Sequence, residues 1–424
     1  MKLRLIIFLC VCLCIFKFSH LAFANNLLTI EDIKKYALAN NFGVKAISQE
    51  LNEAKAQTTQ KRSSFFPNFS FIAGPEIQTY DSKSESSTMG YLSGEWNVFN
   101  GSRDRIELEI SEFNEKIIEV EISKKQFELE LEIENLFYLY LYKLSKFKYY
   151  KKSLELNLKH KKLINQKKFS GLASAADVME FEIRDSILNS EINSLVQEMQ
   201  ETKLGLIRIM GQGLQTNFEP IGDLPHLHVE KQLSDFLSQI NSTSGFIKKS
   251  SYLAAMGSLS LKQSRFSWIP KIDLQMKYGK LPMELSTQFP AFEGAFLLKW
   301  NFFSGFETTG KIAEAQARVN RLNYEFQQKL LDNMSDAEIN YSKLISIQDR
   351  VHAEEGNELR AEKYYNVIIN EYRQGVKNGA DLKAAEELLL SSRIRNAELK
   401  YQFIDNKIKL EKSIGLRIDT VTQP

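Results

Sequence analysis

The stretch Trp96-Asn97-Val98-Phe99-Asn100-Gly101 returns 204 residues later as Trp300-Asn301-Phe302-Phe303-Ser304-Gly305. The same offset of 204 relates Gly171 to Gly375 and Asp177 to Asp381. A period near 200 residues is far longer than a solenoid unit, so it predicts an internal duplication whose halves are each a whole structural unit. We expect one protomer over 25–424, with a first repeat at about 25–212, a linker at about 213–243 and a second repeat at about 244–416.

The first 24 residues have the features of a secretory signal peptide. Lys2 and Arg4 precede an apolar stretch from Leu5 to Phe16, and Ala22-Phe23-Ala24 provides a small-residue cleavage pattern. The apolar stretch is too short for a membrane-spanning helix. We therefore expect residues 1–24 to be removed and the mature chain to start at the next residue.

Cysteine and charge content restrict what the mature chain can do. All cysteines lie within the predicted signal peptide, at Cys10, Cys12 and Cys14. Disulfides, thiolate catalysis and cysteine-bound metals are therefore excluded for the exported form. Removing Lys2, Arg4 and Lys17 from the 55 Lys and Arg residues leaves 52, against 53 Asp and Glu. This near-neutral balance predicts no nucleic-acid partner.

Two very long helices dominate the predicted structure. Residues Ser102 to Phe169 contain no proline and no internal glycine, which predicts a single helix on the order of 100 Å long. Its apolar residues step by four and three, the spacing of a coiled-coil seam, at Ile106, Ile110, Phe113, Ile117 and Val120. A second long helix is predicted from Thr308 to Tyr372. Shorter helices are expected at Thr29 to Ser64, Ala175 to Met210, Phe246 to Phe266 and Ala380 to Ile414.

Four strands are predicted between these helices. Oily and polar residues alternate over about 68–80, 89–99, 271–280 and 291–303, a period of two that is typical of strands. Each strand is about as long as one that crosses a bilayer, whereas the mature chain offers no run of roughly 18 apolar residues. Any membrane span is therefore expected to consist of strands, with Trp96 and Trp300 as membrane-interface aromatics.

This order of elements, all of it duplicated, resembles the outer membrane efflux protein family of TolC-like channels. The specific marks are Phe65-Phe66-Pro67 and Trp268-Ile269-Pro270 before the first strand of each half, the two Trp-Asn-x-Phe-x-Gly sequences, and the glycine turns that lead to Asp177 and Asp381. The sequence Gly222-Asp223-Leu224-Pro225 resembles the linker between the two halves in this family. One departure is Asn40-Asn41-Phe42, where members of the family often have Asn-Pro.

The resemblance implies a mainly α fold with a membrane β-barrel contribution. It implies a homotrimer in which each TolC-like protomer gives four strands to one twelve-stranded barrel and its coiled-coil hairpins to an α-helical tunnel. The implied place is the outer membrane of a Gram-negative bacterium, with a large periplasmic portion. The implied function is a passive channel, not an enzyme, that works with a periplasmic adaptor protein and an inner-membrane transporter in efflux or type I secretion.

The turns that join the long and returning helices are the candidate functional site. These periplasmic tips, at about 169–177 and 373–381, hold Gly171 and Gly375, which can close a helix in the left-handed conformation. Asp177 is predicted to cap the next helix. The resemblance implies that Asp381 faces the periplasmic aperture, in a ring that Lys383 and Ala384 would make weakly cation-selective. With Lys377, these residues form the predicted aperture or partner-docking region.

Other motifs lead to no cofactor or catalytic site. Gly305 to Lys311 resembles the start of a phosphate-binding loop, but Ile312 replaces the required Ser or Thr, so a strand-to-helix corner is the better interpretation. His226 and His228 have no third ligand at metal-site spacing, which favours a solvated loop. We predict no catalytic residue, cofactor or metal ion.

Two other classes of protein share some of these features. A periplasmic adaptor has a long helical hairpin, but normally one hairpin flanked by lipoyl-like and barrel domains. A coiled-coil scaffold would account for the helices and not for the alternating strands. Membrane fractionation separates the three interpretations, because only the channel should resist carbonate extraction.

Overall fold

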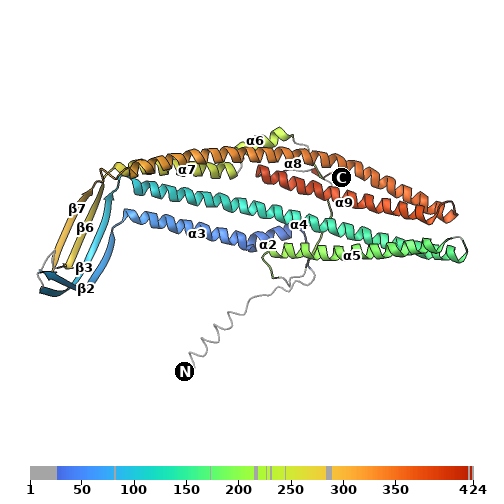
Figure 1. Ribbon diagram of the computed structural model, residues 1–424, viewed down its shortest axis with the longest axis horizontal. Helices are drawn as coiled ribbons and strands as arrows, with labels where there is room; N and C mark the ends of the chain where they lie inside the picture. Colours follow the sequence, from blue (N-terminus) through green and yellow to red (C-terminus); the bar gives the residue numbers. More distant parts are fainter. Residues whose placement is uncertain are drawn as a thin grey trace, which may run out of the picture.

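The chain forms an elongated body in which two long helical hairpins extend from a small antiparallel sheet to two tight turns at the opposite end (Figure 1). This is the mainly helical architecture with four strands that the sequence predicts. The computed structural model describes residues 26–80, 83–171, 173–213, 218–225, 227–229, 232–243, 245–282, 289–418 and 421–422. The predicted signal peptide lies outside the described residues.

Each hairpin consists of one long helix and a returning helix about half its length. The long helices are α4 (Arg103–Phe169, 67 residues) and α8 (Glu307–Gln374, 68 residues), each about 100 Å long at 1.5 Å per residue. The returning helices are α5 (Ala175–Ile209) and α9 (Gly379–Ile414). All four helices begin and end within two residues of their predicted bounds.

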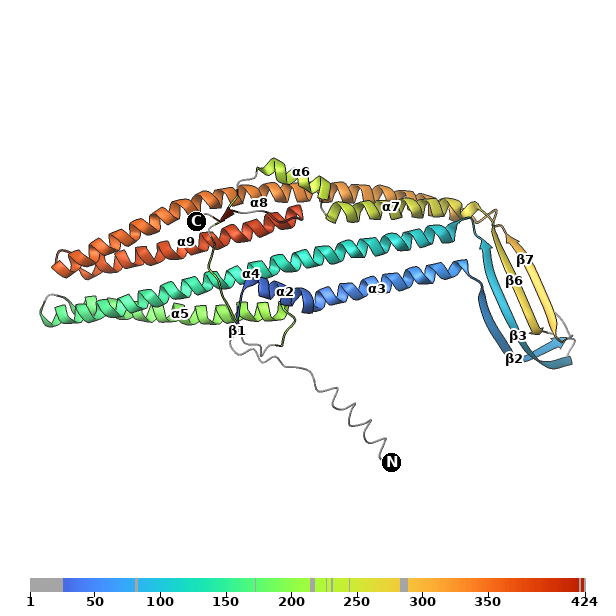
Figure 2. The same ribbon diagram turned by 180° about the vertical axis from the view of Figure 1, so that it is seen from behind.

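Two further helices occupy the length that the returning helices leave free. Helix α3 (Phe42–Arg62) lies along α4, and α7 (Gly245–Arg265) lies along α8. Figure 2 shows that α3 follows α5 end to end along one long helix, as α7 follows α9 along the other. Short 3-10 turns, η1 (Ser63–Phe65) and η2 (Phe266–Trp268), then lead into the sheet.

The first predicted helix is broken in two. Instead of one helix from Thr29 to Ser64, the structure has α2 (Ile30–Asn40) and α3, separated at Asn41. The Asn41 side chain accepts a hydrogen bond from the Gly43 amide at 2.9 Å and donates one to the Ile209 carbonyl at 2.8 Å. Asn41 therefore caps α3 and ties it to the end of α5, within the Asn40-Asn41-Phe42 sequence that departs from the Asn-Pro of the predicted family.

The four long strands form one antiparallel sheet in the order β2-β3-β6-β7. They are β2 (Asn68–Tyr80), β3 (Lys83–Phe99), β6 (Lys271–Lys280) and β7 (Ala291–Lys299). Strand β3 begins six residues before its predicted start. Strand β7 ends at Lys299, four residues before its predicted end, so Trp300 follows the strand and does not belong to it. The central pair β3 and β6 joins the two halves, with Trp96 opposite Leu274.

The corners between the sheet and the long helices are matched at the same offset of 204. Gly101 and Ser102 have φ of +70° and +63°, and Gly305 and Phe306 have φ of +60° and +70°. A left-handed conformation is uncommon for a bulky side chain such as Phe306. Because the same geometry occurs twice, it is a property of the strand-to-helix turn that the sequence predicted at Gly305.

The predicted linker region and the two chain ends add small elements beside the hairpins. They are α6 (Leu233–Thr243) and four short strands: β1 (Asn26–Leu28), β4 (Phe218–Pro220), β5 (Leu227–His228) and β8 (Val421–Thr422). Strand β1 pairs parallel to β4, and β5 pairs antiparallel to β8. These pairings hold the linker and the chain ends against the middle of the helices.

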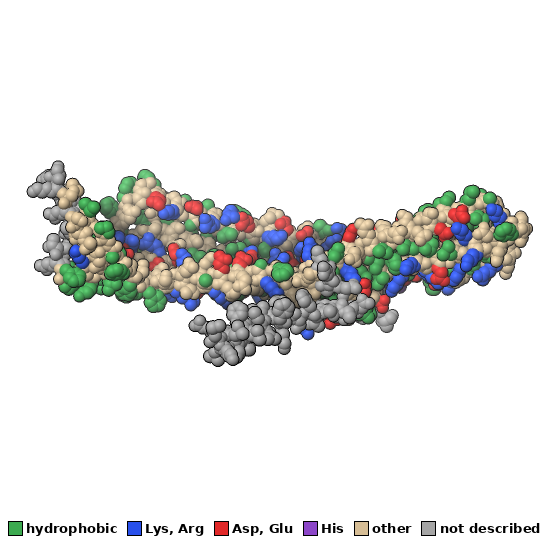
Figure 3. All heavy atoms as spheres, turned by 90° about the horizontal axis from the view of Figure 1, so that it is seen from below, with side chains coloured by type: hydrophobic (Ala, Val, Ile, Leu, Met, Phe, Trp, Pro, Cys, Tyr) green, Lys and Arg blue, Asp and Glu red, His purple; other side chains and the backbone are tan. Residues whose placement is uncertain are grey.

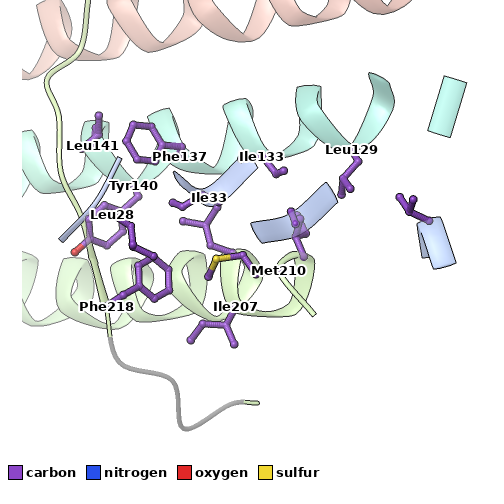
Figure 4. Close-up of a cluster of buried hydrophobic side chains, with 14 residues drawn as sticks. Leu28, Ile33, Leu129, Ile133, Phe137, Tyr140, Leu141, Ile207, Met210 and Phe218 are labelled. Atoms are coloured by element: carbon purple, nitrogen blue, oxygen red, sulfur yellow. The ribbon is translucent and has the colours of Figure 1, made fainter. Parts of the chain in front are cut away.

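The apolar core is divided into clusters along the length of the body. One lies where α2, α4 and α5 meet, and Figure 4 shows Ile33, Met210 and Phe218 between α4 and α5. A second lies among α6, α8 and α9, and a third joins the two hairpins near their turns. Truncating a fully buried side chain such as Phe181 would cost about 3–5 kcal/mol of folding free energy.

A buried ionic cluster links α4 to α9 midway along the hairpins. The Nζ atom of Lys407 lies 3.2 Å from Glu134 and 3.1 Å from Glu411, and Arg417 lies 2.6 Å from Glu134. Burial alone would raise the pKa of Glu134, but Lys407 and Arg417 outweigh it and hold that pKa below its ordinary value of 4.5. The Glu134 carboxylate therefore stays charged in the buried cluster because Lys407 and Arg417 stabilise its negative charge.

Candidate functional site

The hairpin tips end in two glycines with left-handed backbone. Gly171 has φ of +71° and Gly375 has φ of +85°, and Gly375 follows the last residue of α8 directly. A Cβ atom at either position would have no neighbour within 4 Å. The backbone conformation, and not a lack of space, is therefore what favours glycine at both tips.

Both tip aspartates form capping boxes with the residue three positions earlier. The Asp177 amide donates to Ser174 Oγ at 3.1 Å, and the Ser174 amide donates to the Asp177 carboxylate at 2.8 Å. In the second tip the Asp381 amide donates to Asn378 Oδ1 at 2.8 Å, and the Asn378 amide donates back to the carboxylate at 3.3 Å. Each carboxylate thus lies at the start of a helix, as the sequence predicted for Asp177.

One lysine lies beside the second tip aspartate, and another forms an ion pair with the other hairpin. Lys377 Nζ lies 4.0 Å from the Asp381 carboxylate, and Lys383 lies 2.8 Å from Glu180 of the other hairpin. The Asp381 side chain is 39% exposed. A lysine beside this partly exposed carboxylate weakens its negative field.

The two hairpins pack directly against one another behind their tips. A Cβ atom at Gly379, the first residue of α9, would lie 2.9 Å from Ile164 of α4 and 3.7 Å from Phe181 of α5. Lys167 of α4 donates to the Tyr372 carbonyl at 2.6 Å, and its ammonium lies 3.8 Å from the Tyr372 ring centroid. Separating the tips would break these contacts.

A buried polar network joins the hairpins about three helical turns behind the tips. His160 Nδ1 lies 3.2 Å from the Glu386 carboxylate, and His160 Nε2 lies 3.2 Å from the Tyr365 hydroxyl. Ser153 donates to the other Glu386 oxygen at 2.7 Å. We call these four residues, Ser153, His160, Tyr365 and Glu386, the hairpin clasp. Two come from α4, one from α8 and one from α9.

The hydrogen bonds of the hairpin clasp run in one direction. Burial, together with the charge of Glu386, raises the pKa of Tyr365 to about 12, so its hydroxyl keeps its proton at neutral pH. With hydrogen on Nδ1, His160 accepts from Tyr365 and donates to Glu386. Each buried polar group then has a partner, and removing any one of them leaves another unsatisfied.

The hairpin clasp was not predicted, although the sequence contains a signal for it. Ser153, Asn157, His160 and Ile164 are all buried on α4 and step by four, three and four. This is the spacing of the coiled-coil seam, continued with polar residues in place of apolar ones. Polar residues at seam positions are typical of specific contacts between helices.

The two predicted interface tryptophans occupy equivalent places at the sheet end. Trp96 Nε1 donates to the Phe65 carbonyl at 3.2 Å, and Trp300 Nε1 donates to the Trp268 carbonyl, also at 3.2 Å. Both indoles remain exposed, at 38% and 60%. Each indole thus has its N–H satisfied while its ring stays exposed, and the membrane-interface role of both residues stays a prediction.

The remaining sequence candidates are not brought together into a site. Lys311 forms an ion pair with Glu307 at 2.5 Å in the first turn of α8, as expected of a corner. His228 belongs to β5, whereas His226 lies outside the described residues. Among the residues that the structure describes, no group of three or more His, Cys, Asp and Glu side chains could hold a metal ion.

Membrane-spanning helices are not found in the described part of the chain, where no helix combines sufficient length with sufficient apolar character.

Comparison with known families identifies the class of protein. The sequence model of the family described as "Outer membrane efflux protein" matches residues 35–212 and 258–416. These segments cover well over half of the chain, so the chain belongs to the outer membrane efflux protein family. The predicted family is confirmed, and it is a family of channels, not of enzymes. A search of the curated proteins found no matching relative.

Solved structures with the same fold come from several bacteria. VceC from Vibrio cholerae has 15% identity and a TM-score of 0.78, and the match covers 92% of this chain and 97% of VceC. The CmeC channel of Campylobacter jejuni has 13% identity and a TM-score of 0.79, with coverage of 91% and 85%. The open MtrE channel of Neisseria gonorrhoeae has 13% identity and a TM-score of 0.79, with coverage of 93% and 91%. These matches confirm the predicted TolC-like fold.

Proposed function

We propose that the chain is the outer membrane channel of a tripartite efflux or type I secretion system. It acts as a passive conduit, without catalysis, for substrates delivered by an inner-membrane transporter through a periplasmic adaptor. The observation that carries this proposal is the four-stranded sheet with one apolar exposed face, placed at the end of helices about 100 Å long. Family membership supports the same assignment.

The two faces of the sheet differ as the faces of a membrane barrel do. On β7, Phe296 and Leu298 are 75% and 66% exposed. Figure 3 shows hydrophobic side chains gathered at the sheet end of the body. On the other face, Lys277 lies 3.4 Å from Glu293, across the pair β6 and β7. We therefore place the aromatic face in lipid and the charged face in the channel lumen.

The edges of the sheet require further copies of the chain. Within the described residues, β2 and β7 each pair with one neighbouring strand. Unpaired strand edges are not stable in the hydrocarbon core, and four strands are too few to close a barrel. A homotrimer, in which β7 of each copy pairs with β2 of the next, gives the twelve-stranded barrel that the family resemblance implies.

The helices carry a matching unpaired surface. Met179, Ile183 and Ile187 on α5 are spaced by four residues and are 61%, 61% and 49% exposed. On α8, Leu359 and Val367 are 54% and 53% exposed. Apolar stripes of this kind are rarely left to solvent, and neighbouring copies in a closed helical tunnel would cover them.

The opposite end of the molecule is the proposed periplasmic aperture and docking region. It comprises Gly171, Asp177, Gly375, Lys377 and Asp381. Large apolar side chains are also exposed there, with Phe169 at 93% and Val376 at 70%. Exposed apolar residues beside charged ones are typical of a protein-binding surface, which suits the adaptor. Opening would require the hairpins to move apart at the hairpin clasp.

Matched lysine substitutions on neighbouring residues of β7 test the proposed function. Phe296→Lys places a charge on the lipid face, at a cost of about 2–4 kcal/mol near the membrane centre. Ala295→Lys places the same charge on the lumen face, where water accepts it. We expect Phe296→Lys to deplete the carbonate-resistant outer membrane fraction and Ala295→Lys to leave it unchanged. Equal behaviour of the two variants, or complete extraction of the unaltered protein by carbonate, would overturn the proposal.

A further inference from the structure

A cavity of about 680 Å³ lies where α9 ends and α7 begins, between α4 and α8. Gly415, just past the end of α9, and Gly245, the first residue of α7, both line it. Its volume is within the range of small-molecule sites, and it lies far from both the sheet and the tips. The cavity belongs neither to the proposed barrel nor to the aperture.

The duplication provides an internal control for this cavity. Asn333 and Asn340 line it on α8. The residues 204 positions earlier are Leu129 and Leu136 on α4, which belong to, or pack against, the apolar cluster formed with α2. The same positions are thus apolar and filled in the first half, and polar and hollow in the second.

The helix ends at the two junctions differ in the same way. Ile209, the last residue of α5, is buried in the first half. Its counterpart near the end of α9, Ser413, lines the cavity. The residues that line the cavity are exposed or half-buried, so a ligand can reach its polar groups from solvent.

The net charge of the lining residues predicts the charge of a ligand that would bind in the cavity. Five lysines and two acids line the cavity, at Lys124, Lys248, Lys329, Lys409, Lys412, Glu128 and Asp336. Lys124 pairs with Glu128 at 3.9 Å, and Lys409 pairs with Asp405 at 2.5 Å. Among the described residues, Lys248, Lys329 and Lys412 have no carboxylate within 4.0 Å, and Asp336 is the one unpaired acid facing them. Within this described lining, three cations against one anion favour a ligand of charge near minus two.

Aromatic residues complete the lining. Phe127 of α4 and Phe246 of α7 both border the cavity. The Phe246 ring stacks on Phe326 with centroids 5.9 Å apart, which fixes its orientation. A ligand that combines an anionic group with an apolar body would match both parts of the lining.

We propose that this cavity is a binding site for a small organic dianion, of the phosphate monoester class. The phosphate contacts Lys248 of α7, Lys329 of α8 and Lys412 of α9, and the organic part lies against Phe127 and Phe246. A ligand held this way joins α7, α8 and α9 where α9 ends and α7 begins. Binding therefore stabilises the second half of the molecule.

The test uses phenyl phosphate with the full mature protein in detergent. We expect calorimetry to show saturable binding, one site per protomer, which weakens at high ionic strength. Lys329→Gln and Lys412→Gln should each weaken binding about tenfold, the loss typical of one charge-assisted contact. The matched control is Lys363→Gln, elsewhere on α8, which should bind as the unaltered protein does. A rise in melting temperature on addition of phenyl phosphate gives an independent measure of the same binding.

Two comparisons separate the parts of the proposal. Phe246→Ala should weaken phenyl phosphate and leave the weaker binding of inorganic phosphate unchanged. Equal affinity for phenyl phosphate and inorganic phosphate would overturn the organic class. Absence of saturable binding at millimolar phenyl phosphate, or equal loss in the Lys363→Gln control, would overturn the site. Neither result would alter the proposed channel function, which is tested at β7.

Discussion

His160 Nδ1 on α4 lies 3.2 Å from the Glu386 carboxylate on α9, and the two side chains are only 6% and 4% exposed. This contact joins the two hairpins of one protomer behind the tips. Because Ser153 and Tyr365 complete the network, its members are satisfied only while the hairpins stay together. The hairpin clasp is therefore the contact whose loss should most directly loosen the tips.

Removing the carboxylate of the hairpin clasp should destabilise the protein and loosen the tips. Glu386→Ala removes the buried partner of His160 Nδ1 and of Ser153 Oγ, which costs about 1–3 kcal/mol of unfolding free energy. Glu386→Gln keeps an acceptor and should cost less. The neighbouring Glu387→Ala, which removes a partly exposed pair with Arg184, is the control. Melting temperature and single-channel conductance are the measurements. We expect conductance to rise only in Glu386→Ala, and an unchanged Glu386→Ala protein would refute the role of the hairpin clasp.

Alanine in place of a tip glycine should lower the stability of the protein because of the left-handed backbone conformation alone. Gly375→Ala meets no neighbour but must hold φ of +85°, which costs about 1–2 kcal/mol for an L side chain. Gly310 on α8 also has no neighbour within 4 Å but lies within a helix, where alanine is favoured by about 1 kcal/mol. We expect opposite shifts in melting temperature for Gly375→Ala and Gly310→Ala. Shifts of the same sign would show that the tip conformation is not what requires glycine.

Acid should remove the stability that the buried ionic cluster provides. Lys407 and Arg417 lower the pKa of Glu134, against the effect of burial, below its ordinary value of 4.5. A lowered folded-state pKa gives stability that is fully present above the unfolded pKa, and it is lost as the pH falls through the folded pKa. Glu134→Gln should therefore lower the melting temperature at pH 7, and its difference from the unaltered protein should shrink below pH 4.5. Glu132→Gln, at an exposed position, is the control. A constant difference across this pH range would contradict the assignment.

The two tip aspartates offer a matched test of the aperture. Asp177→Ala and Asp381→Ala each remove one capping box, so both should lose a similar stability of about 0.5–2 kcal/mol. Only Asp381 is proposed to face the aperture. Reversal potentials in a salt gradient should therefore show reduced cation preference in Asp381→Ala and not in Asp177→Ala. If selectivity is the same in both variants, Asp381 serves only as a cap.

Most of the helical fold could be predicted because its signals are local. Between Ser102 and Phe169 nothing interrupts the helix, and glycine ends each long helix at the tip. The break at Asn41 was missed because Asn41 was not recognised as the cap of α3, and its contact with the distant Ile209 carbonyl is visible only in the structure. The early end of β7 at Lys299 was missed because the alternation of apolar residues continues past the last paired residue.

The polar contacts between hairpins were harder to predict. Sequence places Ser153, Asn157 and His160 on a seam but does not show which helix faces them. Glu386 is one of many helical glutamates, and only the structure distinguishes it by its burial. The cavity at the α7–α9 junction likewise requires the two halves to be compared in space. Local patterns therefore predicted the elements, and pairings between distant residues needed the structure.

The measurement that tests the central claim most directly is the native mass of the mature protein extracted from the outer membrane in mild detergent. The open edges of β2 and β7 and the exposed stripe on α5 predict three copies per particle. A particle with the mass of a trimer, which inserts into a planar bilayer and conducts ions, is the expected result. A protein recovered only as a monomer, with no conductance, would contradict the shared barrel and the channel function that rests on it.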